Sequence, residues 1–155
     1  LGASKVLYLE HGYLAGDDTD SHIDTLARFV SEDTIMYIKC EDIEDEHFKE
    51  LDLMEKELQA IAKEEGFNLI SLPFTSPIYD GKERLPATYA NFLFVNGAIL
   101  VPVYDTKEDE EALEVFKNTF SKRDIIPINC TTLIKQHGSL HCVTMNFARA
   151  VRLLI

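Results

Sequence analysis

Apolar residues recur along the chain with two different spacings, and together these predict alternating strands and helices. Short runs rich in aliphatic and aromatic residues predict strands at 5–10, 34–40, 68–72, 98–103 and 124–128. Apolar residues that recur every three or four positions predict amphipathic helices at 23–30, at 51–61 and at about 108–120. Gly66 is expected to end the long second helix. The pattern therefore indicates the α/β class.

Turn residues divide this pattern further. Asn96-Gly97, between apolar runs at 89–95 and 98–103, is a strong signal for a β-hairpin. The polar segment 73–86 contains proline and is long enough to suggest a functional loop rather than a simple connection.

Two regions of the chain resemble each other. Residues 34–73 and 98–127 each read as a strand, an acidic turn, an amphipathic helix and a short strand ending near proline. This internal repeat predicts an α/β unit that is repeated around a common centre. Two units cannot close a ring, and Leu1 is not a start methionine. We therefore expect the 155 residues to be part of a longer polypeptide.

Composition limits the kinds of partner. The chain has 155 residues, of which 46% are hydrophobic, and this is enough for one ordinary core. The net charge of −12 disfavours nucleic acid and anionic membranes as partners and favours small cationic molecules. No apolar run approaches the length of a membrane span. Three widely spaced cysteines, Cys40, Cys130 and Cys142, indicate neither a disulfide framework nor a CxxC metal site, so a reducing, cytoplasmic location is expected.

The most unusual segment is 16–24, Gly-Asp-Asp-Thr-Asp-Ser-His-Ile-Asp, which holds four carboxylates and one imidazole. A helix start needs only one or two capping residues, so this surplus predicts a site for a cationic ligand or a metal. A calcium loop fits poorly, because the alternating Asp18, Asp20, His22 and Asp24 lack the glycine and the glutamate that such a loop requires. Ordinary roles stay open for His22 at a helix start and for Asp24 in the first helical turn.

A second candidate segment is 138–144, Gly-Ser-Leu-His-Cys-Val-Thr, a small-residue turn that is expected to lead into an apolar strand. Cys142 is the candidate nucleophile, although a cysteine in such a strand is more often a buried, inert side chain. Strand alternation would point His141 to the opposite face from Cys142, which excludes it as a base unless the strand is distorted. His137 is expected on a loop and remains a candidate base.

Three motifs together resemble one family. Residues 11–29, from His-Gly-Tyr-Leu-Ala-Gly to Ala-Arg-Phe, closely resemble the agmatine deiminase family, which is related to bacterial peptidylarginine deiminases. Residues 84–92, Arg-Leu-Pro-Ala-Thr-Tyr-Ala-Asn-Phe, resemble the stretch before that family's hairpin, and residues 138–144 resemble its nucleophile strand. The resemblance covers nearly the whole chain but only the C-terminal portion of the family's sequence.

The resemblance implies a guanidine-modifying, pentein-type fold, which is a pseudo-fivefold α/β propeller of strand-strand-helix-strand modules. Residues 1–155 would be the C-terminal portion of a single deiminase domain, about two modules plus the nucleophile strand, and the N-terminal half of the same protein would be absent. The resemblance also implies hydrolysis of agmatine to N-carbamoylputrescine and ammonia, a step of putrescine biosynthesis in polyamine metabolism, with no metal and no organic cofactor.

By the same resemblance, Cys142 is the nucleophile, His22 the general acid and base, and Asp24 a carboxylate that binds the guanidinium. Asp18 would bind the distal amine of agmatine. The family's second guanidinium-binding carboxylate has no candidate in this chain, and Lys135-Gln136-His137 departs from the glycine-rich sequence of many relatives.

Other functions stay open on the sequence. They are deimination of peptidyl-arginine, a catalytically silent fragment that binds cations or another chain, and a thiol amidohydrolase with a Cys-His-Asp triad on another fold. Assembly into a homo-oligomer is also compatible with the sequence.

Overall fold

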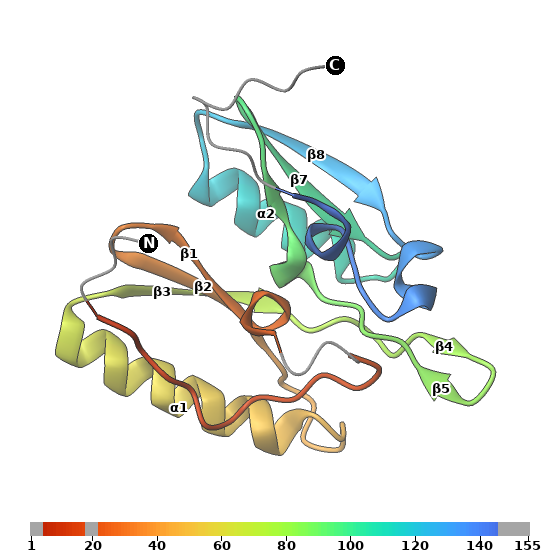
Figure 1. Cartoon of the computed structure of the whole chain (residues 1–155), viewed down its shortest axis with the longest axis horizontal. Helices are drawn as coiled ribbons and strands as arrows, with labels where there is room; N and C mark the ends of the chain where they lie inside the picture. The colour runs from red at the N-terminus through yellow and green to blue at the C-terminus, as the bar shows by residue number, and fades with distance from the viewer. Residues whose placement is uncertain (1–4, 18–21, 146–155) are drawn as a thin grey trace.

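The computed structural model describes residues 5–17 and 22–145, and these form two modules with the same order of elements (Figure 1). The first module contains β1 (Ala27–Ser31), β2 (Thr34–Lys39), α1 (Phe48–Glu65) and β3 (Asn68–Pro73). The second contains β6 (Leu93–Phe94), β7 (Ala98–Val103), α2 (Asp109–Thr119) and β8 (Asp124–Asn129). In each module the first two strands pair antiparallel and the last two pair parallel across the helical connection. The predicted α/β class is confirmed, and the predicted repeat of strand, helix and strand over 34–73 and 98–127 corresponds to β2-α1-β3 and β7-α2-β8.

The first module is built around one amphipathic helix. Leu51, Met54, Leu58 and Ala62 recur at helical spacing and form the buried face of α1. Gly66 then ends the helix in the left-handed region, at φ 78°, and its N–H donates to the carbonyl of Ala62. The chain returns as β3, which pairs with β2 over six consecutive positions. The predicted second helix, its glycine stop and the following strand are therefore confirmed.

The second module has an aromatic core. Phe92 and Phe116 meet edge to face with ring centroids 5.0 Å apart, and Phe94 packs in the same way on Phe120 at 5.7 Å. Asn96-Gly97 forms the predicted turn between β6 and β7, with Gly97 at φ 84°. The hairpin is confirmed, although its first strand is shorter than the pattern suggested because residues Tyr89–Asn91 form a 3-10 turn, η2.

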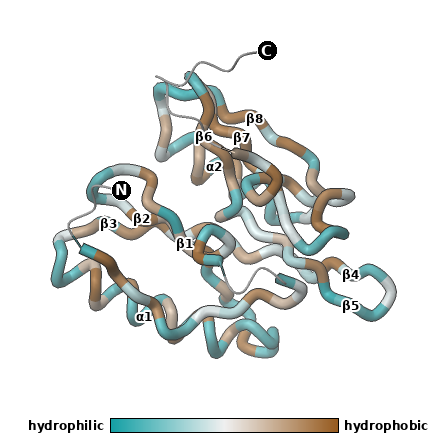
Figure 2. Tube along the Cα trace, in the orientation of Figure 1, coloured by the Kyte–Doolittle hydropathy of each residue, from teal (hydrophilic) through white to brown (hydrophobic). Residues whose placement is uncertain are grey.

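Segment 73–92 runs from the first module to the second. It carries the small hairpin of β4 (Tyr79–Asp80) and β5 (Glu83–Arg84), which projects from the body of the molecule in Figure 1. Figure 2 shows hydrophobic stretches along the strands, β8 among them, whereas the tip of the β4–β5 hairpin is hydrophilic. After the hairpin, η2 is fully buried and contacts β2, β3, β7 and a second 3-10 turn, η1 (Ile23–Thr25). Of the helices in the described part of the chain, none is long and apolar enough to cross a membrane.

Two predicted elements near the N-terminus are wrong. Residues 5–10 form no strand, because this segment lies along α1, where the N–H groups of Glu10 and His11 donate to the carboxylate of Glu57. Residues 23–30 form no helix, because only η1 is helical and the chain then enters β1. The backbone pairs with β2 from Leu26 onwards, so tertiary pairing overrides the helical spacing of the apolar residues.

Candidate active site

Three short 3-10 turns bring the candidate residues together from distant parts of the chain. Asp24 lies on η1, Asn91 on η2, and Cys142 on η4 (His141–Val143). The strand predicted for residues around Cys142 is wrong: Leu140 and the next residues turn helically instead of extending. The expectation that His141 points away from the site fails for the same reason.

Asp24 is the centre of this cluster. Its Oδ2 lies 2.6 Å from Nδ1 of His141 and accepts a hydrogen bond from Nδ2 of Asn91 at 3.1 Å. A carboxylate only accepts, so Nδ1 of His141 carries the proton in this contact. The side chains of Asp24 and His141 are 20% and 24% exposed, so the pair is partly shielded from water. Short, charge-assisted bonds of this kind fix the orientation of a carboxylate.

Asn91 joins Asp24 to the nucleophile segment. Its Oδ1 accepts from the backbone N–H of His141 at 2.7 Å and of Cys142 at 3.3 Å, and the Cys142 sulfur lies 3.5 Å away. Its Nδ2 also donates to the backbone carbonyl of Asp24 at 3.3 Å. Asn91 is fully buried, so each of these bonds replaces a bond to water. Asn91 was not among the site residues expected from the sequence, although it lies in the motif at 84–92.

A chain of buried hydroxyl groups holds the three turns in place. Thr88 caps η2 by accepting from the N–H of Ala90, and its hydroxyl donates to the carbonyl of Thr25 at 2.7 Å. The hydroxyl of Tyr104 donates to the carbonyl of Thr88, so the neighbouring hydroxyl of Ser139, at 2.7 Å, is the donor to Tyr104. Burial raises the pKa of Tyr104 far above its ordinary value, so it stays a neutral donor.

Cys142 differs from the other two cysteines. Cys40 and Cys130 are buried, and burial raises the pKa of each thiol, whereas Cys142 is exposed. A Cβ at Gly138 would lie 3.0 Å from the Cβ of Cys142 and 3.5 Å from its sulfur. Glycine at position 138 therefore leaves room for the thiol.

The other histidines have separate surroundings. His22 precedes η1; its ring is exposed and caps no backbone amide, while its carbonyl accepts from the hydroxyl of Thr25 at 2.9 Å. His137 lies on the predicted loop, and its Nδ1 is 2.9 Å from the carbonyl of Gly16, to which it must donate. This bond ties His137 to the acidic segment rather than to Cys142. Asp18, expected to bind the distal amine, lies outside the described residues.

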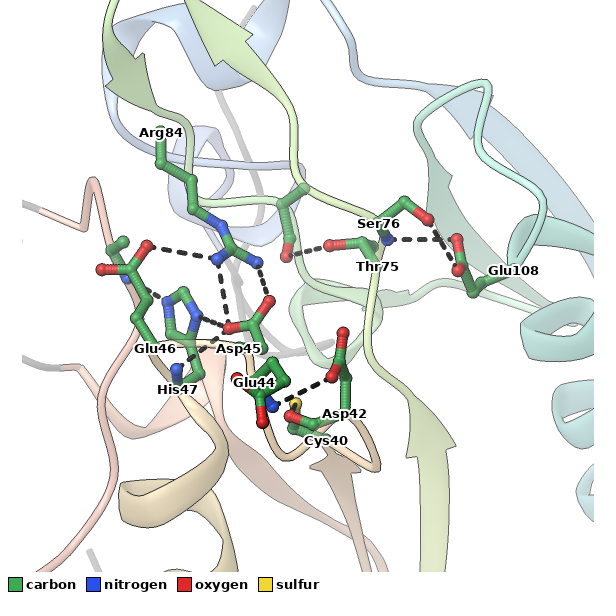
Figure 3. Close-up of polar contacts among 12 residues, drawn as sticks. Cys40, Asp42, Glu44, Asp45, Glu46, His47, Thr75, Ser76, Arg84 and Glu108 are labelled. Carbon is green, nitrogen blue, oxygen red and sulfur yellow. Dashed lines mark hydrogen bonds and ion pairs between the residues drawn. The ribbon is translucent and has the colours of Figure 1, made fainter.

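The acidic segment is anchored at its beginning by a buried charge network (Figure 3). Nε2 of His47 accepts from the N–H of Ala15 at 2.8 Å, and its Nδ1 lies 2.7 Å from Oδ1 of Asp45. Arg84 grips the same carboxylate with two nitrogens, at 3.1 and 2.8 Å. Burial lowers the pKa of His47, so the ring is neutral and donates through Nδ1 to Asp45.

The backbone of the acidic segment also touches Arg84 directly. Gly16 lies at φ 79°, and a Cβ there would come within 2.3 Å of the carbonyl oxygen of Arg84. Only glycine fits this position without a shift of the backbone. The motif at 84–92 and the acidic motif are therefore packed against each other, which the sequence could not show.

A cavity of about 350 Å³ lies elsewhere, where β2 and β3 end near the start of α2. Its lining includes Asp42, Asp45, Lys107 and Glu108, and Figure 3 shows Ser76 bonded to Glu108 beside it. The side chains of Asp24, Asn91 and Cys142 do not line this cavity. Among residues 5–17 and 22–145, no group of three His, Cys, Asp or Glu side chains is arranged to hold a metal ion.

Comparisons with known proteins find deiminases among the proteins that this chain resembles. Residues 1–147 match the family model of Porphyromonas-type peptidyl-arginine deiminase. The agmatine deiminase of Medicago truncatula is 30% identical over 93% of this chain and 44% of its own length. The crystal structure of a candidate arginine deiminase from Porphyromonas gingivalis is 55% identical, with a TM-score of 0.92, over 96% of this chain and 44% of that chain. A substrate-bound variant of the C. jejuni agmatine deiminase is 44% identical, with a TM-score of 0.85, over 90% of this chain and 41% of that chain.

The chain thus spans about 44% of the length of the curated relatives it matches. The match includes the acidic segment, the motif at 84–92 and the segment of Cys142, and it covers both modules. The chain belongs to the Porphyromonas-type peptidyl-arginine deiminase family.

Proposed function

We propose that this chain is the C-terminal portion of an enzyme that hydrolytically deiminates a small guanidino compound, with agmatine as its substrate. The single observation that carries the proposal is the placement of Asp24 and Cys142 on either side of one buried amide, that of Asn91. An accessible thiol and a carboxylate that can bind a guanidinium are therefore held in one cluster.

The proposed chemistry follows from the properties of a guanidinium. This group is planar and always charged, and resonance makes its central carbon a poor electrophile. Asp24 neutralises part of the charge and fixes the plane, so the thiolate of Cys142 approaches the carbon from one face. Attack forms a C–S bond and a tetrahedral adduct. The C–N bond then breaks, His22 protonates the departing ammonia, and a covalent thiouronium intermediate remains.

The second half of the reaction releases the product. Water, deprotonated by the same His22, attacks the thiouronium carbon, and the C–S bond breaks with return of the thiolate. For agmatine the product is N-carbamoylputrescine. The exposed ring of His22, free of any capping role, is consistent with such proton transfer. No metal or organic cofactor takes part in these steps.

The second guanidinium-binding carboxylate, for which this chain offers no candidate, is proposed to come from an N-terminal half of the protein. Two modules are proposed to form a segment of a pseudo-fivefold propeller, and an N-terminal half supplies the remaining modules and the second guanidinium-binding carboxylate. The coverage of about 44% of the curated relatives supports this proposal. Exposed apolar side chains, including Phe29 on β1 and Ile126 on β8, are consistent with surfaces that further modules cover. The isolated chain should therefore be inactive and prone to associate.

Agmatine is favoured over peptidyl-arginine by two considerations. The acidic segment offers Asp18 to a terminal amine that a peptide lacks, and curated relatives are named agmatine deiminases. Peptidyl-arginine remains the second candidate, because the matching family model is named for that activity. Three free cysteines agree with a reducing, cytoplasmic setting.

The test is ammonia release by the full-length polypeptide from agmatine, from free arginine and from an arginine-containing peptide. Agmatine should give the highest kcat/KM. A higher kcat/KM for the peptide would replace agmatine by peptidyl-arginine, and release from none of the three would overturn the deiminase assignment.

A further inference from the structure

We propose that His47 is a positioning residue of the deimination site: its neutral ring holds the chain at Ala15, just before the acidic segment, and protonation of the ring in acid releases that chain. This inference rests on the proposed function, because it concerns how the segment that leads to the site is held. His47 acts through the backbone of residues 15–17 and is assigned no contact with the substrate.

The bond between His47 and Ala15 requires an unprotonated ring nitrogen. A backbone N–H can only donate, and the nitrogen of Ala15 lies 2.8 Å from Nε2 of His47. The single ring proton is therefore on Nδ1, which lies 2.7 Å from Oδ1 of Asp45. A second proton would be on Nε2 and would face the N–H of Ala15, with a donor against a donor. The bond is thus lost as soon as the ring is charged.

Two aromatic rings enclose the imidazole. Tyr13, from the chain just before Ala15, stacks on it with ring centroids 5.1 Å apart, and Phe74, which follows β3, meets it at 4.8 Å. His47 itself is fully buried (Figure 3). A charge on this ring becomes hydrated only if Tyr13 and Ala15 move away, so protonation of the ring and release of this stretch are coupled.

Three charged groups face the ring. Asp45 and Glu46 precede it in the chain, and the guanidinium of Arg84, on β5, holds the carboxylate of Asp45. Burial is the largest effect and lowers the pKa of His47; Asp45 opposes this shift and Arg84 adds to it. The anchored ring therefore binds a proton less readily than an imidazole in water, whose pKa is about 6.5. Acid favours the released state, because that state takes up the proton.

The anchored stretch contacts η1 through Asp17. The N–H of Asp17 donates to the carbonyl of Leu14 at 3.2 Å, which closes a turn around Ala15. The carboxylate of Asp17 lies 3.2 Å from the hydroxyl of Thr25, the residue after Asp24 on η1. When Ala15 is released, this turn and its contact with η1 lose their fixed position. Asp24 then loses one of its supports.

A second histidine bonds the same turn, but acid does not break its bond. His137 donates from Nδ1 to the carbonyl of Gly16 at 2.9 Å. A protonated imidazole still has this donor. His47 accepts instead, so its bond to the backbone is the one that protonation removes.

Two amide side chains that do not titrate separate the acceptor of His47 from its donor. The oxygen in His47→Gln reaches as far as Nε2 and keeps an acceptor for Ala15, whereas His47→Asn reaches only as far as Nδ1 and keeps the contact with Asp45. At pH 8 the full-length His47→Gln enzyme should keep kcat/KM near that of the parent. His47→Asn should lose on the order of 100-fold, because a misplacement of about 1 Å has that effect on rate. Equal kcat/KM for the two variants overturns the role of the bond to Ala15.

The pH profile tests the release in acid. The measured quantity is kcat/KM of His47→Gln divided by that of the parent at each pH, which cancels the titration of groups common to both. The ratio should be flat above about pH 6.5 and should rise as pH falls towards 5, by at most about tenfold per unit, because release takes up one proton. A ratio that stays flat down to pH 5 overturns the proposal.

His11 gives a matched control from the same stretch of chain. Its ring is 38% exposed and lies 3.3 Å from the carboxylate of Glu50 and 3.8 Å from that of Glu57. His11→Gln removes an imidazole four residues before Ala15 and leaves the bond of His47 intact, so its kcat/KM should stay near that of the parent at every pH. A ratio that also rises in acid for His11→Gln would assign the effect to the charge of the region and overturn the role of His47.

Amide hydrogen exchange needs no turnover and separates this inference from the proposed function. Exchange of the peptide that contains Ala15 is divided by its intrinsic rate at the same pH. In the parent this corrected rate should be higher at pH 5.5 than at pH 7.5, by up to about tenfold, and in His47→Gln it should not change. A parent enzyme without deiminase activity sinks the proposed function. An active parent whose corrected rate is the same at both pH values, or changes equally in His47→Gln, sinks the role of His47.

Discussion

Replacing Arg84 by methionine should reduce the free energy of unfolding by about 3 kcal/mol, since removal of one partner of a buried ion pair typically costs about 3–5 kcal/mol. The side chains of Arg84 and Asp45 are only 10% and 8% exposed, and two nitrogens of Arg84 hold the carboxylate at 3.1 and 2.8 Å. Methionine keeps much of the apolar contact of the arginine stem but leaves the carboxylate of Asp45 without its cation.

The pKa of Asp45 gives an independent magnitude. Burial alone would raise this pKa, but the guanidinium of Arg84 and the N–H groups of His47 lower it from 3.8 to about 2. A difference of about two pKa units corresponds to roughly 2–3 kcal/mol, because each unit is worth about 1.4 kcal/mol. A depressed pKa contributes stability above the unfolded value near 4, and that stability is lost as pH falls through about 2. The deficit of Arg84→Met should thus shrink between pH 4 and pH 2.

Urea unfolding of the full-length polypeptide at pH 7 and at pH 3 measures this deficit. Arg84→Lys keeps the charge without the two parallel bonds and should fall between the parent and Arg84→Met. Lys135→Met removes an exposed pair with Asp80 and should change the free energy of unfolding by less than about 1 kcal/mol. A loss below about 1 kcal/mol for Arg84→Met at pH 7, or an equal loss at both pH values, would refute the reasoning.

The remaining predictions concern the reaction of the full-length polypeptide, measured by ammonia release and substrate binding. Cys142→Ser should bind agmatine but keep less than about a hundredth of the turnover, because a hydroxyl is a far weaker nucleophile than a thiolate; higher turnover would exclude Cys142. His22→Asn should slow both half-reactions. Accumulation of a covalent adduct at the rate of the parent would show that His22 acts only in hydrolysis and that another group protonates the departing ammonia. Asp24→Asn should weaken guanidinium binding by about 2–5 kcal/mol, and unchanged binding would return Asp24 to a structural role. Asp18→Asn should penalise agmatine more than an analogue without the distal amine; equal losses would remove Asp18 from the site.

Local signals predicted much of the fold. The long helix α1 has its buried face, its glycine stop and its following strand within one stretch of sequence, and Asn96-Gly97 specifies a turn by itself. The repeated order of strand, helix and strand over 34–73 and 98–127 could be read for the same reason. The region before β1 could not be predicted in this way. Its structure depends on the hydrogen bond between the backbones of Leu26 and Ile38 rather than on the spacing of the neighbouring apolar residues.

The site was predictable only in part. Motif resemblance named Asp24 and Cys142 as candidates, but Asn91, which bonds Asp24 and the backbone of Cys142, is 67 positions from the first and 51 from the second. No periodicity reports a contact over that distance. The bond between His141 and Asp24 could not be predicted either, because the sequence pattern predicts a strand where the chain forms the turn η4. The anchoring of the acidic segment by His47 depends equally on tertiary structure.

The contrast among the three thiols makes the protein a selective target for covalent labelling. Cys40 and Cys130 are shielded, and burial raises the pKa of both, so an alkylating reagent meets mostly unreactive protonated sulfur there. Cys142 is accessible. A brief exposure of the native chain to a cationic haloacetamidine should therefore add one label, found by mass spectrometry on the peptide that contains Cys142. After unfolding, the same reagent should reach all three, so the number of labels per chain reports how much of the population is folded.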